Sequence, residues 1–109
     1  MQLLITHDAL EKINTISPTS SPELWLYYDT EGCGCGVNGV PTVKFFDQKK
    51  RDYELVYNKD LNVFVHAQQA VFFGEEIILD FRNNFFQLKN KEEMLNPRIS
   101  ETQLLQAVN

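Results

Sequence analysis

Both cysteines of the chain, Cys33 and Cys35, lie one residue apart in a stretch where Gly32, Gly34 and Gly36 alternate with them. Glycine has no Cβ and reaches positive φ freely, so this backbone can bend around an ion or approach a partner closely. Thiolates are soft metal ligands. The pattern predicts thiolate chemistry, and Cys33 and Cys35 are the candidate residues for it.

Two other interpretations of this cysteine pair stay open. Free cysteine is often a small buried hydrophobe, so the stretch can also be a tight glycine turn. A redox thiol needs a lowered pKa, but Glu31 and the absence of an adjacent Lys or Arg act against that, so this role is less favoured. A disulfide between residues this close in sequence would be strained.

Length and composition predict one soluble domain, residues 1–109. The net charge is −5, and the only basic cluster, Lys49-Lys50-Arg51, is flanked by Asp47 and Asp52, which opposes nucleic-acid binding. No apolar run approaches the roughly 18 residues of a membrane span, and the N-terminus does not resemble a secretory signal. We therefore expect a cytoplasmic protein without a membrane partner. No catalytic arrangement of Ser, His and Asp or of paired carboxylates is evident, so an enzyme is not predicted.

Helices are predicted near both ends of the sequence. Thr6 can cap a helix whose apolar positions follow a helical period; these positions are Ala9, Leu10, Ile13 and Ile16. At the other end, Ser100 and Gln103 form a capping box ahead of a short C-terminal helix.

Between the helices the pattern predicts mainly strands. Leu24–Tyr28 is apolar on both faces, as in a central strand, and leads into the glycine stretch. Further strands are expected at Val43–Phe46, Tyr53–Tyr57, Leu61–Ala67, Glu76–Phe81 and Phe85–Leu88.

The connections complete this prediction. The strands from residue 43 to residue 67 read as a meander, in which Tyr53, Leu55 and Tyr57 form a half-buried face. Asn83-Asn84 is a predicted turn, and 89–97 reads as a charged loop. The pattern does not decide the structure of 68–73.

The order of these elements resembles the HesB-like family of A-type iron-sulfur carriers, and most closely a divergent Gram-positive branch of it. The resemblance is carried by Leu24–Tyr28 leading to Gly32-Cys33, Val63-x-Val65, Phe73-Gly74, Ile77–Phe81 and Asn96-Pro97. It implies a mainly β domain, a small β-sandwich or flattened barrel of about six to seven mostly antiparallel strands with an N-terminal and a C-terminal helix.

In the carriers, one cysteine from the glycine turn and two from a C-terminal Cys-Gly-Cys tail hold iron or a cluster. This chain has no cysteine after Asn96-Pro97. The resemblance therefore implies Cys33 and Cys35 as ligands of iron or an Fe-S cluster. Because two thiolates are fewer than the four of a usual structural site, a homodimer would supply the rest. Iron-sulfur assembly or recipient proteins are the implied partners.

The resemblance implies a role in iron-sulfur cluster biogenesis, and the alternative is a metal-free protein-interaction module with the same fold. Among the other candidate ligands, His66 is expected to be structural or solvent-facing, and His7 has no companion ligand near it in sequence. Asp80 is expected to be a turn or surface charge, and it occupies a family-like position that merits a test.

Overall fold

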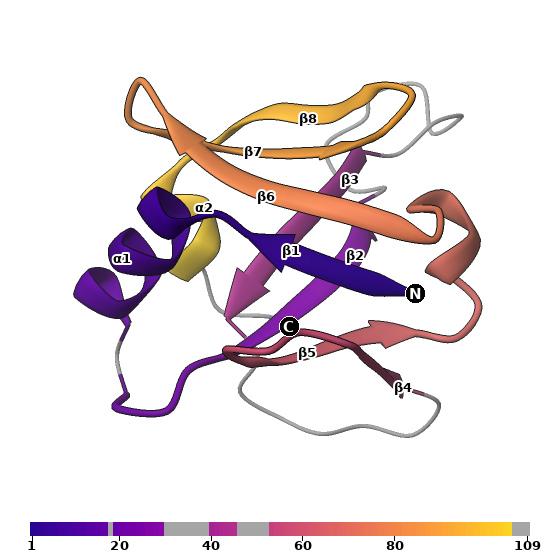
Figure 1. Cartoon of the computed structure of the whole chain (residues 1–109), viewed down its shortest axis with the longest axis horizontal. Coiled ribbons are helices and arrows are strands. Elements are labelled where there is room, and N and C mark those ends of the chain that lie inside the picture. The colour runs from indigo at the N-terminus through magenta and orange to yellow at the C-terminus, as the bar shows by residue number, and fades with distance from the viewer. Residues whose placement is uncertain (18, 30–39, 46–52, 106–109) are drawn as a thin grey trace.

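The structure is a computed structural model that describes residues 1–17, 19–29, 40–45 and 53–105. The elements in these ranges are β1 (Gln2–Ile5), α1 (His7–Ile16), β2 (Glu23–Asp29), β3 (Val40–Phe45), β4 (Tyr53–Val56), β5 (Asn62–His66), the 3-10 helix η1 (Ala70–Phe72), β6 (Glu76–Arg82), β7 (Phe85–Asn90), β8 (Met94–Ile99) and α2 (Glu101–Leu105). The strands form two four-stranded sheets, with strand orders β1-β6-β7-β8 and β3-β2-β5-β4, and both α-helices lie at one end of them (Figure 1).

Strand pairing confirms a mostly antiparallel β-sandwich. β1 runs parallel to β6 and β2 runs parallel to β5, whereas the other four pairings are antiparallel. The predicted meander from residue 43 to residue 67 is wrong, because β3 and β4 lie at opposite edges of their sheet. Alternation along a strand carries no information about which strand lies alongside it.

The space between the sheets is filled by aliphatic and aromatic side chains from both sheets and both helices. The helix positions predicted to be apolar behave as expected, since Ala9 and Ile13 are fully buried and Leu10 and Ile16 pack against the core. The buried hydrophobic residues are Leu3, Ile5, Ala9, Ile13, Leu24, Leu26, Val43, Val56, Val63, Val65, Phe73, Ile77, Leu79, Phe86, Leu88, Ile99 and Leu104. Neither helix has the length and apolar composition needed to span a membrane, within the part of the chain that is described.

The local signals at helix ends and at one turn are confirmed. The Ala9 amide donates to the Thr6 hydroxyl at 3.3 Å, and the Ser100–Gln103 capping box makes both of its reciprocal bonds. Asn83 and Asn84 have φ of 54° and 70°, as a two-residue hairpin turn between β6 and β7 requires.

The prediction of a loop over 89–97 is wrong, because β7 extends to Asn90 and β8 begins at Met94. The Asn90 carboxamide oxygen accepts from the amides of Glu92 and Glu93 and turns the chain between the two strands. β8 is an edge strand of which only Ile99 is fully buried, so it lacks the alternation that marks a strand in sequence. The described residues thus contain eight strands rather than about six to seven.

The predicted buried face of β4 is also wrong. Val56 is 1% exposed, whereas Leu55 and Tyr57 are 66% and 67% exposed. Val56 pairs with Val63 of β5 and faces the core, and Tyr57 leaves the strand to form an isolated bridge with Gln2. The tertiary pairing therefore selects the face that sequence alternation assigned to solvent.

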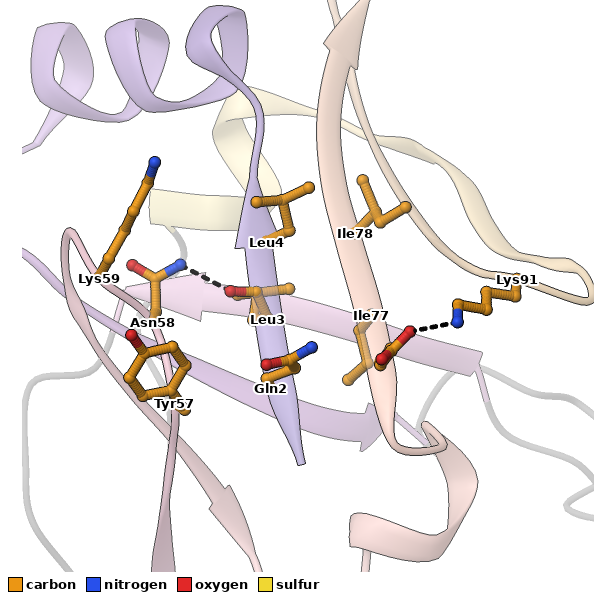
Figure 2. Close-up of a pocket in the computed structure, with 10 residues that line it drawn as sticks. Gln2, Leu3, Leu4, Tyr57, Asn58, Lys59, Ile77, Ile78 and Lys91 are labelled. Carbon is orange, nitrogen blue, oxygen red and sulfur yellow. Dashed lines mark hydrogen bonds and ion pairs between the residues drawn. The ribbon is translucent and has the colours of Figure 1, made fainter.

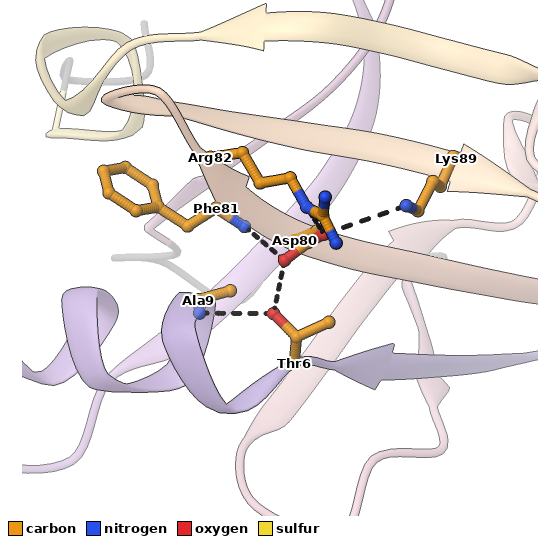
Figure 3. Close-up of polar contacts among 6 residues, drawn as sticks. All are labelled: Thr6, Ala9, Asp80, Phe81, Arg82 and Lys89. Carbon is orange, nitrogen blue, oxygen red and sulfur yellow. Dashed lines mark hydrogen bonds and ion pairs between the residues drawn. The ribbon is translucent and has the colours of Figure 1, made fainter.

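Asp80 is a buried carboxylate rather than the surface charge predicted from sequence. Its side chain accepts hydrogen bonds at 2.8 Å from the Thr6 hydroxyl, the Phe81 amide and Arg82 Nε (Figure 3). Lys89 Nζ lies 3.8 Å from the same carboxylate. Because the Thr6 hydroxyl also caps α1, the cluster fastens the start of α1 to β6.

These contacts decide the ionisation of Asp80. Burial by itself raises the pKa of the carboxyl, but the hydrogen bonds from Thr6, Arg82 and Phe81 and the charge of Arg82 outweigh burial and lower the pKa. The folded state therefore favours the ionised form more than the unfolded chain does, and the resulting stability is present above the unfolded pKa of about 3.9.

We predict that Asp80→Asn lowers the free energy of unfolding by about 1–3 kcal/mol at neutral pH, because a charged acceptor of three hydrogen bonds is lost. The difference from the wild type should shrink as pH falls below about 4 and Asp80 becomes protonated in the wild type. Urea unfolding at several pH values measures both effects. The matched control is Asp60→Asn on an exposed turn, and an equal response of the two variants would contradict the prediction.

Candidate functional site

The cysteine-bearing stretch connects two strands of one hairpin. β2 and β3 pair from Leu24 opposite Phe45 up to Asp29 opposite Val40, and residues 30–39 join that last pair. Cys33 and Cys35 lie outside the described residues. β2 is the central strand that the sequence predicted, and β3 begins at Val40, earlier than predicted. Pro41 fits within β3 because β3 is an edge strand.

One side of the hairpin end is fastened to β8. The carboxamide nitrogen of Asn96 donates to the carbonyl of Pro41 at 2.9 Å, and Pro41 directly follows Val40 of the Asp29–Val40 pair. Asn96 belongs to the first sheet and Pro41 to the second, so this hydrogen bond joins the two sheets beside the connection. Sequence reasoning identified Asn96-Pro97 as a family-like turn but had no signal for this contact, because the partners are far apart in sequence.

The other side of the hairpin end is fastened to the segment around η1. The Tyr28 amide donates to the side-chain oxygen of Gln69 at 3.0 Å. The rings of Tyr28 and Phe72 stack with centroids 4.0 Å apart. The stretch that the sequence pattern left undecided thus positions the strand that leads into residues 30–39.

His66 has a structural role in this arrangement. It ends β5, its Nδ1 accepts from the Gln68 amide at 3.1 Å, and its ring meets the ring of Tyr53 edge-on at 5.5 Å. Burial raises the pKa of the Tyr53 hydroxyl. Because Nδ1 accepts from the backbone, Nε2 carries the proton of the neutral ring, so neither nitrogen of His66 offers a lone pair to a metal in this arrangement.

The remaining predicted candidates do not gather at the hairpin end. His7 is exposed on α1 and lies 3.2 Å from the Glu11 carboxylate, and the contacts of Asp80 come from the β1–α1 corner, β6 and β7. Among the described residues, no three His, Cys, Asp or Glu side chains are close enough to hold a metal ion. Cys33 and Cys35 lie outside this described set.

The described chain beyond Asn96 contributes two side chains to the core. Ile99 at the end of β8 and Leu104 in α2 are both fully buried, and Lys12 of α1 forms an ion pair with Glu101. This described part of the C-terminal segment is therefore held against α1 and β3, and it brings no cysteine towards the hairpin.

Comparisons with known proteins bear on both the family and the fold. A family described as iron-sulphur cluster biosynthesis matches residues 1–102. The uncharacterised protein YqkB of Bacillus subtilis (strain 168) is 35% identical over 77 residues, which cover 69% of this chain and 72% of YqkB.

Solved structures share the fold at low sequence identity. A candidate Fe-S biosynthesis protein from Lactobacillus salivarius has a TM-score of 0.73 at 16% identity, covering 92% of this chain and 95% of that one. IscA, whose crystal structure was determined with a [2Fe-2S] cluster, has a TM-score of 0.65 at 12% identity and is covered completely, with 92% of this chain matched.

We predict that Asn96→Ala lowers the free energy of unfolding by about 1 kcal/mol, because the part-buried carbonyl of Pro41 loses its donor. Chemical denaturation measures this loss. Asn62→Ala is the matched control, since the hydrogen bond of the Asn62 side chain to Glu23, among the described residues, is exposed. Two variants of equal stability would show that the Asn96 contact does not fasten the hairpin.

Proposed function

This chain belongs to the iron-sulphur cluster biosynthesis family, as its resemblance predicted, and we propose that it binds iron or an iron-sulfur cluster as cargo through Cys33 and Cys35. The observation that carries the proposal is the placement of both thiols in one ten-residue connection. That connection starts and ends on a fixed strand pair, Asp29 opposite Val40, in a chain with the fold of IscA.

The donor set suits such cargo chemically but is incomplete in one chain. Thiolates are preferred ligands of iron-sulfur clusters, which usually take four of them. One chain offers two, and its C-terminal segment supplies no other thiol. The two remaining thiolates of a four-thiolate site would therefore come from another molecule.

A second copy of the chain is the donor we propose. A twofold axis passing near residues 30–39 would bring two Cys33–Cys35 pairs together, because such an axis presents the same surface from each subunit. This dimer would supply four sulfurs. Assembly or recipient proteins would exchange the cargo by replacing one pair with their own ligands.

We further propose that the protein is a cytoplasmic, non-enzymatic carrier. A reducing compartment keeps Cys33 and Cys35 as thiols. The described residues show His66 bonded to the backbone and Asp80 committed to hydrogen bonds within the fold, so neither is arranged as a general base beside the hairpin. A metal-free interaction module is the alternative, and the incorporation of the C-terminal segment into the core favours it.

Iron and sulfide content after anaerobic reconstitution tests the proposal. We expect the wild type to retain both iron and sulfide. The Cys33→Ser/Cys35→Ser double variant should contain at least about tenfold less iron than the wild type. Sedimentation should show a dimer for the iron-loaded wild type and a monomer for the double variant.

The control variant is His66→Gln, which should keep its iron because His66 serves the fold rather than the cargo. If the wild type and the double variant are both folded and neither retains iron, the result would favour the interaction module. Iron that survives in the double variant would instead place the binding site elsewhere.

A further inference from the structure

A hollow lies on the outer side of the first sheet, over β1 and β6. Its volume is about 250 Å³, and the residues that line it include Leu4, Ile78, Tyr57, Lys59, Glu76 and Lys91 (Figure 2). None of the residues that fasten the cysteine-bearing hairpin lines it. The proposed carrier function therefore leaves this hollow without a role.

The accessible surface of the hollow is mostly apolar. Leu4 and Ile78 are cross-strand neighbours on the outer face of the β1–β6 pair. Leu4 is 52% exposed, and the ring of Tyr57 borders the hollow on the side of β1 that faces away from β6 (Figure 2). Apolar side chains that are exposed within a concavity are typical of a small-molecule site.

The walls are held in place by hydrogen bonds within the fold. On one side of β1, the Leu3 amide donates to the Tyr57 carbonyl at 2.9 Å, and the Asn58 carboxamide donates to the Leu3 carbonyl at 2.7 Å. On the other side, β1 pairs with β6 in parallel register. The hollow is therefore preformed, which lowers the ordering cost of binding.

The two cations at the rim differ in their partners. Lys91 Nζ lies 2.7 Å from the Glu76 carboxylate, and this contact raises the pKa of Lys91. Lys59, at the opposite side, is exposed and has no ion pair with any described residue. The unmatched positive charge of the hollow is therefore at Lys59.

We propose that this hollow binds a small carboxylate with an apolar body, such as a medium-chain fatty acid. The apolar body lies over Leu4 and Ile78, and the carboxylate pairs with the Lys59 ammonium. The volume of 250 Å³ is just below the roughly 300–1,000 Å³ of sites for drug-sized ligands, which suits a ligand of this small size.

Titration with octanoate, followed by NMR of the Leu4 and Ile78 methyl groups, tests the proposal. Octanol is the uncharged control ligand with the same chain length, and octylamine is the cationic one. We expect saturable shifts with octanoate, and binding of octanol about fivefold weaker, the upper range for an exposed ion pair. Added salt should weaken octanoate binding but not octanol binding.

Variants assign the carboxylate contact. Lys59→Gln should reduce octanoate binding to the level of octanol, Lys59→Arg should retain it, and Lys44→Gln on β3 should leave it unchanged while removing the same charge. Equal binding of octanoate and octanol, no effect of Lys59→Gln, or no saturable shift would overturn the proposal. None of these outcomes bears on Cys33 and Cys35, because the titration uses metal-free protein.

Discussion

The fold depends on the fastening of β1 and the start of α1 to β6. The Thr6 amide bonds to the Leu79 carbonyl at 3.0 Å, and the Thr6 hydroxyl bonds to the Asp80 carboxylate while it caps α1. A buried carboxylate is costly unless its hydrogen bonds are satisfied, and Asp80 is satisfied by β6 itself and by the β1–α1 corner. This cluster fixes where the chain turns from strand to helix.

The same short strand joins the two sheets. β1 pairs with β6 on one edge and bonds to Tyr57 and Asn58, which follow β4 of the other sheet, on its second edge. At another place the Asn96–Pro41 contact also joins the sheets, beside the cysteine-bearing hairpin. Both candidate ligand sites therefore lie next to connections between the sheets, where backbone positions are held from two sides.

The described part of the C-terminal segment serves the core of this chain. Ile99 and Leu104 occupy the core, so the described residues after Asn96 stabilise the sandwich instead of presenting thiols. Under the proposed function, the four thiolates are divided between two copies of the chain, so a second protein can take over the cargo by replacing one Cys33–Cys35 pair. Four ligands from one chain would retain the metal more firmly.

Local sequence signals determined the helix caps, the Asn83-Asn84 turn, the central position of β2 and the presence of the cysteines in the connection after it. Each depends on residues within a few positions of one another or on an apolar run. Only the tertiary structure decided the strand β8, the buried face of β4 and the burial of Asp80. Edge strands lack clear alternation, and the partners of Val56 and Asp80 are distant in sequence, so no local pattern records them.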